Sequence, residues 1–140
     1  IDYLGIDNYP LSLKIINLLD YKLSKKDKIF FNSIHNSKWD FKNEIHKKFL
    51  LTKINSDLLF FKSNTDYNVI YYDAFSPRKQ PDLWTKKIFK KMYGLTSENG
   101  VLVTYCAKGK VRRDLEKVGY KVQRLIGPLG KREMIRAIKI

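Results

Sequence analysis

Short apolar runs alternate with segments of helical periodicity along most of the chain. The runs are rich in β-branched and aromatic residues, as is typical of buried strands, and they span residues 2–7, 67–73, 101–107, 120–126 and 134–140. Apolar residues that recur every three or four positions predict helices over 11–23, 82–93 and 110–118. Strands and helices that alternate through short connections predict an α/β fold with a mostly parallel sheet.

The predicted helices have recognisable ends. Pro10 suits the first turn of the helix over 11–23, and the polar run SKKDK (24–28) interrupts its apolar pattern. Asp82 is the expected N-cap of the helix over 82–93. Gly119 is expected to close the helix over 110–118.

The pattern in the middle of the chain is mixed. Four residues suggest a helical insertion, placed roughly over 24–50 of a domain that spans 1–140: Trp39, Phe41, Ile45 and Phe49. The segment FLLTKI (49–54) favours a strand instead, and the apolar run 57–61 suits a further buried strand.

The composition indicates one folded domain rather than a disordered chain. Hydrophobic residues make up 44% and aromatic residues 14% of the 140 residues, which is enough to build a core. No apolar run approaches the roughly 18 residues that a membrane span needs, and residues 1–10 have no signal-peptide pattern. A cytoplasmic protein without a membrane partner is therefore expected.

Several classes of site are not indicated by the sequence. Cys106 is the only cysteine and lies in an apolar run, where it is expected to be buried. His35 and His46 lack metal-ligand spacing with an acid or a thiol, so no metal is expected. No glycine-rich Walker loop is present, which leaves a kinase or ATPase without support.

Charge gives the first indication of a binding partner. Lys and Arg number 28 against 14 Asp and Glu, and the net charge of +14 favours polyanions such as nucleic acid or anionic lipid. Residues 108–140 alone contain eleven basic and three acidic residues. One alternative is that the overall charge reflects a lysine-rich composition and solvated faces. That alternative explains the cluster in 108–140 less well, because its arginines lie beside glycine turns.

Ligands of open α/β sheets bind beyond the carboxyl ends of the strands, so the residues at those ends are the first candidates for a site. Asp7 ends the first predicted strand and is the type of residue that accepts hydrogen bonds from ribose hydroxyls. An acid before a helix is as often a cap. A third strand end, 104–109, contains Gly109, which either lets a ligand approach the backbone or starts a helix.

Asp73 ends the strand predicted over 67–73 and is followed by Ala74-Phe75-Ser76-Pro77. A carboxylate at this position can hold an amine nucleophile against a methyl donor, and the aromatic ring can pack on a base. The alternative is that Asp73 caps the following turn.

Three segments of the chain resemble a known enzyme family. They are YYDAFSPRKQPDLW, GVLVTYCAKGKVRRDLEKVGYKV and GPLGKREMIRA, and they occur in the family's order. They are similar to the methyltransferase that completes 5-methylaminomethyl-2-thiouridine at the wobble position of tRNA. The resemblance covers nearly the whole chain and is strongest from Tyr67 to Ala137. It implies a Rossmann-like class I fold that transfers a methyl group from S-adenosyl-L-methionine to the aminomethyl nitrogen of the uridine.

The resemblance also implies roles for particular residues. Asp73 and Phe75 are expected at the methyl-transfer site, with Asp73 also beside the cofactor, and Asp7 is expected to contact the cofactor ribose. Independently of the resemblance, the basic cluster in 108–140 places five residues on one tRNA-facing surface beside the site: Lys108, Arg112, Arg113, Lys131 and Arg132. The structural alternative is an internal pair that joins Arg113 or Arg132 to Glu116 or Glu133. A flavin-dependent oxidase, fused to the methyltransferase in some family members, is the expected partner that acts earlier on the same uridine.

Two departures from the family pattern concern the cofactor site. Family members begin with a strand and a glycine-rich E-x-G-x-G-x-G loop that holds the methionine end of the cofactor, whereas this sequence starts one strand later, on IDYLGID. An N-terminally truncated domain, inactive by itself, is therefore expected. Phe61 and Lys62 stand where the family has Gly-Asp, so Ser63 or Asn64 would have to supply the adenine-side contacts.

The sequence thus predicts an S-adenosyl-L-methionine-dependent N-methyltransferase that acts on tRNA. Two alternatives remain open. One is a methyltransferase that acts on an amine of another nucleic acid. An assay on tRNA lacking the wobble modification would distinguish this enzyme from the tRNA methyltransferase. The other is a basic RNA-binding protein without turnover. Titration with the cofactor would distinguish this protein from an enzyme.

Overall fold

The computed structural model describes residues 1–130 and 132–140. The chain divides into two compact units, Ile1–Phe61 (unit 1) and Lys62–Ile140 (unit 2), and each is described by itself. Among the described residues, no helix combines the length and the apolar character that crossing a membrane requires.

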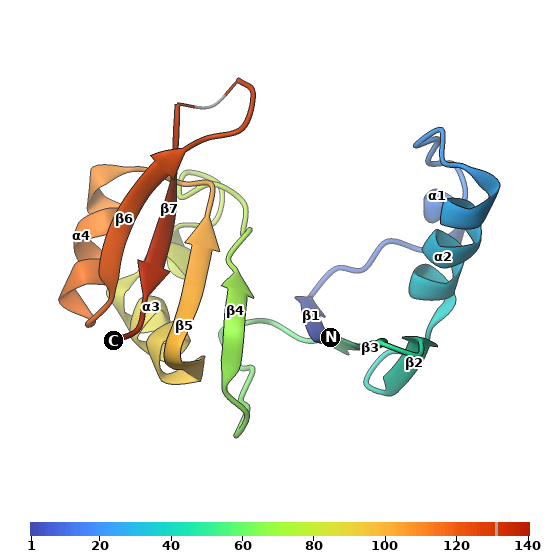
Figure 1. The fold of residues 1–140 in the computed structure, drawn as a ribbon, viewed down its shortest axis with the longest axis horizontal. Coiled ribbons are helices and arrows are strands. Elements are labelled where there is room, and N and C mark those ends of the chain that lie inside the picture. Colours follow the sequence, from blue (N-terminus) through green and yellow to red (C-terminus); the bar gives the residue numbers. More distant parts are fainter. Residues whose placement is uncertain (131) are drawn as a thin grey trace. The chain divides into compact units, whose positions relative to one another are not determined.

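Unit 1 contains a three-stranded sheet and two helices (Figure 1). Its strands lie in the order β1-β3-β2, and they are β1 (Asp2–Asp7), β2 (Lys42–His46) and β3 (Phe49–Asn55). β1 pairs parallel with β3 over its whole length, and β2 pairs antiparallel with β3. The helices are α1 (Leu13–Ile16) and α2 (Lys25–Asn36). The buried apolar residues of unit 1 are Ile16, Leu51 and Phe61, so its core is small.

The helix predicted over 11–23 is wrong in extent, because only α1 is helical there. Most of the predicted apolar stripe has no core to bury it: Leu11 is 56% exposed and Leu18 is 77% exposed. The polar run 24–28, expected to interrupt a helix, instead begins α2. The Ser24 hydroxyl accepts a hydrogen bond from the Asp27 N–H, as an N-cap residue does, and donates one to the Asp27 carboxylate.

The helical periodicity predicted from Trp39 to Phe49 is also wrong. β2 and β3 occupy this part of the chain, and exposure alternates residue by residue along β2, which is the period of a strand. The strand predicted over 49–54 is confirmed as β3. The run 57–61 is a turn, since the Asp57 carboxylate accepts from the Leu59 N–H at 2.8 Å.

Unit 2 contains a four-stranded sheet in the order β4-β5-β7-β6. Its strands are β4 (Tyr67–Tyr71), β5 (Thr96–Thr104), β6 (Lys121–Ile126) and β7 (Glu133–Ile138). β4 pairs parallel with β5, while β7 pairs antiparallel with both β5 and β6. The α/β class is confirmed, and the strand pairing is mixed rather than purely parallel.

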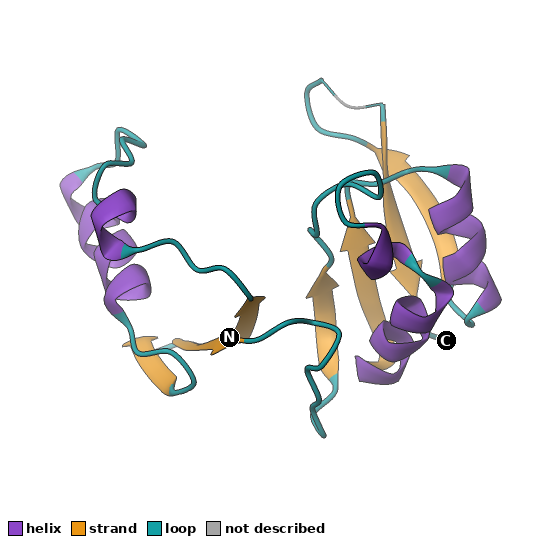
Figure 2. Ribbon diagram, turned by 180° about the vertical axis from the view of Figure 1, so that it is seen from behind, coloured by secondary structure: helices purple, strands orange, loops and turns teal. Residues whose placement is uncertain are grey.

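The helical elements of unit 2 are η1 (Pro81–Trp84), α3 (Lys86–Leu95) and α4 (Gly109–Lys117). Figures 1 and 2 show α3 and α4 on the same face of the four-stranded sheet. The core lies between these two layers, where five apolar side chains are fully buried: Phe89, Leu102, Leu115, Ile135 and Ala137. Burying a side chain of the size of Leu or Phe stabilises a fold by about 1.5–3 kcal/mol.

The helix predicted over 82–93 is corrected to a 3-10 turn followed by α3. Thr85, not Asp82, is the N-cap of α3, because its hydroxyl accepts from the Ile88 N–H. The helix over 110–118 is confirmed as α4, and Gly119 follows it with φ +116°. A Cβ at Gly119 would lie 3.0 Å from the Tyr93 ring, so both the backbone conformation and the close approach require glycine.

Candidate functional site

The carboxyl ends of β4 and β5 lie side by side at one edge of the sheet in unit 2. The two strands are parallel, Tyr71 is the register partner of Val103, and the Tyr72 N–H donates to the Val103 carbonyl at 2.8 Å. Asp73 and Tyr105 therefore leave neighbouring strands at the same level. This is the edge at which open α/β sheets bind their ligands.

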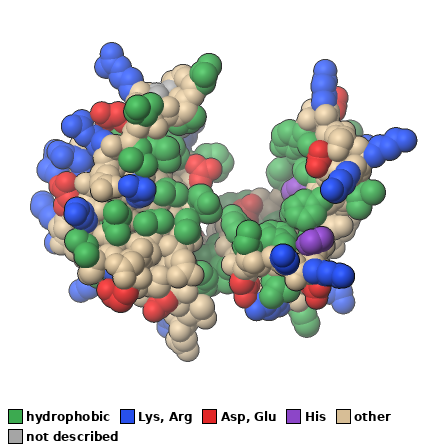
Figure 3. Space-filling model, in the orientation of Figure 1, with side chains coloured by type: hydrophobic (Ala, Val, Ile, Leu, Met, Phe, Trp, Pro, Cys, Tyr) green, Lys and Arg blue, Asp and Glu red, His purple; other side chains and the backbone are tan. Residues whose placement is uncertain are grey.

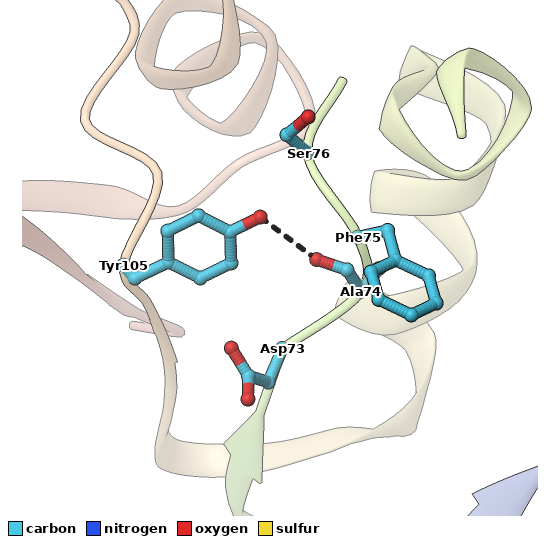
Figure 4. A pocket seen from close by; sticks show the side chains of 5 residues that line it. All are labelled: Asp73, Ala74, Phe75, Ser76 and Tyr105. Atoms are coloured by element: carbon cyan, nitrogen blue, oxygen red, sulfur yellow. Dashed lines mark hydrogen bonds between the residues drawn. The ribbon is translucent and has the colours of Figure 1, made fainter. Parts of the chain in front are cut away.

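An open pocket of about 280 Å³ lies at this edge and is lined by Asp73, Ala74, Phe75, Ser76 and Tyr105. Figure 4 shows the Asp73 carboxylate on the same side of the 73–76 segment as the Tyr105 ring. The Phe75 ring lies on the opposite side of that segment and is 72% exposed. The segment thus presents a carboxylate to one side and an aromatic face to the other.

Three side chains hold the backbone of Ala74 and Phe75. The Tyr105 hydroxyl donates to the Ala74 carbonyl at 2.9 Å (Figure 4). The Phe75 N–H donates to Gln80 Oε1 at 3.0 Å, and Trp84 Nε1 donates to the Phe75 carbonyl at 2.7 Å. Both backbone groups of Phe75 are therefore bound by side chains.

Trp84 is itself fixed by the core of unit 2. Its indole is 4% exposed and makes edge-to-face contacts with the rings of Tyr72 and Phe89. The Tyr72 hydroxyl donates to the Leu83 carbonyl, and burial raises the pKa of Tyr72, so its phenol stays protonated. The 73–76 segment is in this way connected to the buried core of the unit.

Tyr105 was not among the site residues expected from the sequence. Burial raises the pKa of Tyr105, and electrostatic interactions with Cys106 and Asp73 raise it further, so the hydroxyl remains a donor. A signal for it existed in the sequence: two apolar strands ending in Asp73 and in Tyr105 would be neighbours in a parallel sheet, which brings their following residues together.

The expected cofactor residues are distributed over both units. Asp7 ends β1 in unit 1, is exposed, and accepts the Tyr9 N–H at 2.8 Å. This bond uses one carboxylate oxygen, and a carboxylate can accept further donors at the other. Ser63 lies in the loop before β4, where its hydroxyl is 3.1 Å from the Tyr67 hydroxyl and accepts from the Thr65 N–H at 3.0 Å. Asn64 is exposed in the same loop.

Three of the expected tRNA-facing residues lie at the start of α4. Lys108 is exposed at its N-cap position, Arg113 is exposed, and Arg112 is half-buried. In Figure 3, basic side chains gather along the side of unit 2 where α4 lies. Arg132 is exposed in the connection between β6 and β7, a separate segment. Lys131 falls outside the described residues.

The internal pairs considered as an alternative involve different arginines. Arg112, rather than Arg113, lies 3.7 Å from Glu116, one helical turn away. Arg124, rather than Arg132, lies 3.2 Å from Glu133, because the register of β6 and β7 brings these two side chains close. Within residues 1–130 and 132–140, no group of three or more His, Cys, Asp or Glu side chains is placed to hold a metal ion.

A family model described as S-adenosyl-L-methionine-dependent methyltransferase matches residues 20–140. The matched part includes the whole of unit 2, and with it the pocket formed by the 73–76 segment and Tyr105.

Curated relatives match a shorter stretch. The chain is 41% identical over 64 residues to the tRNA 5-methylaminomethyl-2-thiouridine biosynthesis bifunctional protein MnmC of Azoarcus sp. (strain BH72), which covers 46% of this chain and 10% of that protein. It is 37% identical over 68 residues to the protein of the same name from Burkholderia thailandensis, covering 49% of this chain and 10% of that protein. The chain thus spans about a tenth of the length of these relatives.

Solved structures show the same fold. MNMC2 from Aquifex aeolicus matches with a TM-score of 0.74 at 19% identity, covering 97% of this chain and 42% of that one. A methyltransferase from Pyrococcus furiosus matches with a TM-score of 0.52 at 17% identity, covering 66% of this chain and 50% of that one. The family expected from the sequence motifs is confirmed: the chain belongs to the S-adenosyl-L-methionine-dependent methyltransferases, and S-adenosyl-L-methionine is its cofactor.

Proposed function

We propose that this protein methylates the 5-aminomethyl group of the wobble uridine in tRNA, giving 5-methylaminomethyl. The observation that carries the proposal is the arrangement at the end of β4, where the Asp73 carboxylate adjoins a backbone segment that presents the exposed Phe75 ring. The printed name of the curated relatives, which concerns this modified nucleoside of tRNA, supports the same substrate.

When bound, S-adenosyl-L-methionine would supply an electrophilic methyl group: its S–CH3 bond would break as the N–CH3 bond forms, and S-adenosylhomocysteine would leave. The residues of the chain would therefore need only to orient the amine and take up its proton. Asp73 accepts an N–H of the aminomethyl group, which directs the nitrogen lone pair toward the methyl carbon, and takes up the proton that the nitrogen loses. Phe75 stacks on the uracil ring and holds the base that carries the amine.

The residues proposed to hold the cofactor fit its chemistry. The exposed carboxylate of Asp7 suits the two ribose hydroxyls, and Asp73, which lines the pocket, is proposed to lie beside the transferred methyl group. Of the two residues proposed for the adenine side, Asn64 is the more available, because the Ser63 hydroxyl already bonds with Thr65 and Tyr67.

The tRNA backbone is proposed to contact Lys108, Arg112, Arg113 and Arg132, together with Lys131. Support comes from the position of Lys108, which follows the carboxyl end of β5 and so lies toward the edge that carries the pocket. The word bifunctional in the names of the relatives indicates a second activity in those proteins. For this chain, a flavin-dependent oxidase that acts earlier on the same uridine is proposed as the partner.

The test is transfer of a labelled methyl group to tRNA that carries 5-aminomethyl uridine at the wobble position. Asp73→Asn keeps the shape of the side chain and is expected to lower the rate by about 10²–10⁴-fold. Asp82→Asn is the matched control, because Asp82 is an exposed acid in η1 and lies outside the pocket. The protein assayed carries the family's glycine-rich segment fused before residue 1, because residues 1–140 alone are expected to be inactive. With that protein, label appearing only in another nucleic acid, or tRNA binding without any transfer, would contradict the proposal.

A further inference from the structure

Phe75 combines an exposed side chain with a fully bound backbone. Its ring is 72% exposed, while its N–H and its carbonyl are each bound by a side chain, Gln80 and Trp84 respectively. Exposed loops usually leave such backbone groups to water. Water could have bound the N–H and the carbonyl of Phe75, so the hydrogen bonds from Gln80 and Trp84 need a further explanation.

The three side chains that hold this segment come from three parts of unit 2. Gln80 lies in the loop that follows the segment, Trp84 in η1, and Tyr105 just after β5. Their bonds, at 3.0, 2.7 and 2.9 Å, fall on two consecutive residues, Ala74 and Phe75. Together they fix the direction in which the Cα–Cβ bond of Phe75 points.

A backbone held in this way loses little freedom when a flat molecule stacks on the Phe75 ring. Ordering of loops and side chains at the moment of binding weakens an interaction, and a segment that is already ordered avoids that loss. The arrangement suits a planar base, because stacking requires the ring plane to be in place but needs no hydrogen bond from the ring.

We propose that Gln80 and Tyr105 are positioning residues, which hold the Ala74–Phe75 backbone so that the Phe75 ring receives the target base of tRNA. This inference rests on the proposed function and adds to it two residues that hold the backbone from which the ring projects. Neither residue needs to touch the cofactor or the reacting nitrogen. Their removal is therefore expected to change the use of tRNA more than the use of S-adenosyl-L-methionine.

The experiment compares two variants and one control with the wild type, each carrying the added glycine-rich segment of the methylation assay. Gln80→Met removes the acceptor for the Phe75 N–H at similar volume, and Tyr105→Phe removes only the hydroxyl that donates to Ala74. Tyr71→Phe is the control, because it removes the same atom from an exposed tyrosine on β4. Trp84 is left unchanged, because it is part of the core.

Four quantities are measured: hydrogen exchange of the Phe75 amide, KM for tRNA, KM for S-adenosyl-L-methionine, and the melting temperature. Gln80→Met is expected to speed exchange of the Phe75 amide. Both variants are expected to raise KM for tRNA about 2- to 10-fold, the range for loss of one hydrogen bond, with KM for S-adenosyl-L-methionine and the melting temperature unchanged. Tyr71→Phe is expected to change none of the four.

An unchanged KM for tRNA in both variants, alongside normal methylation by the wild type, would overturn the positioning roles and leave the proposed function intact. A rise in both KM values together with a fall in melting temperature would also overturn them, because it indicates general destabilisation. A wild type that neither binds nor methylates tRNA would overturn the proposed function and this inference with it.

Discussion

The indole Nε1 of Trp84 donates a 2.7 Å hydrogen bond to the carbonyl of Phe75. This bond joins a side chain that is 4% exposed to a residue whose ring is 72% exposed. A residue of the core thus directly holds the backbone beneath the most accessible aromatic ring of the pocket.

Phe75→Ala is expected to weaken tRNA binding without unfolding the protein. Stacking of a base on an aromatic ring contributes about 1–3 kcal/mol, so Kd for tRNA should rise about 5- to 100-fold. The exposed ring contributes little to the core, so the melting temperature should stay within a few degrees. Phe60→Ala provides the control, because Phe60 is an exposed phenylalanine in unit 1. Equal effects of the two changes on Kd would argue against stacking at Phe75.

Arg113→Gln is expected to lower the salt dependence of tRNA binding. Removing one cation that binds a phosphate reduces the slope of log affinity against log salt by about 0.7–0.9, with similar effects on different RNAs. Arg112→Gln should have a smaller effect, because Arg112 lies 3.7 Å from Glu116 and is partly neutralised. Lys42→Gln in unit 1 removes a charge that is paired with Asp2 and serves as the control. An unchanged slope for Arg113→Gln would remove the start of α4 from the tRNA interface.

Thr85→Ala is expected to destabilise unit 2 more than Asp82→Ala does. The Thr85 hydroxyl accepts from the Ile88 N–H at the start of α3, and loss of such a cap costs about 1 kcal/mol. Asp82 lies earlier, in η1, and its side chain does not cap α3. Urea unfolding of the two variants measures the difference. A larger loss for Asp82→Ala would show that the helix begins where the sequence pattern suggested.

The stability of unit 2 is expected to fall at high pH, when the buried phenol of Tyr120 loses its proton. Burial raises the pKa of Tyr120 from 10.0 to about 12, and its hydroxyl lies 2.6 Å from that of Thr96. The folded state therefore holds the phenol proton more tightly than the unfolded state does. The resulting stabilisation is complete below pH 10 and is lost as the pH rises through 12, by up to about 3 kcal/mol.

Tyr120→Phe isolates this effect. The difference in unfolding free energy between wild type and variant should shrink from about pH 10 to about pH 12, as measured by urea titration. Tyr9→Phe, which makes the same change at an exposed tyrosine, is measured beside it as the matched control. A constant difference for Tyr120→Phe would show that the folded state does not protect this proton.

The sequence predicted unit 2 better than unit 1, and burial explains why. Val111 and Leu115 recur at helical spacing in α4 and are both buried, so the apolar stripe reports a real contact with the sheet. In unit 1 the equally regular residues Leu11 and Leu18 are exposed, so their spacing carried no structural information. The local signal that would have located α2 was Ser24 followed by Asp27.

The candidate site was predicted in part for a similar reason. Asp73 and Phe75 stand in one short segment, so a local motif was enough to propose them. Tyr105 comes 30 residues after Phe75 and joins it only through the pairing of β4 with β5. The bonds from Gln80 and Trp84 depend on side-chain directions that the spacing of apolar residues does not encode.

The strand order of unit 2 also has a consequence for its synthesis. β7 lies between β5 and β6, although it follows both of them in the chain. During translation, β5 and β6 leave the ribosome before the strand that joins them, and Ile135 and Ala137 of β7 complete the buried layer. The nascent sheet therefore has a gap at its centre, and a stalled or shortened polypeptide would leave two strands without the neighbour that connects their hydrogen bonds. Such intermediates expose unpaired edges, which are substrates for chaperones and proteases.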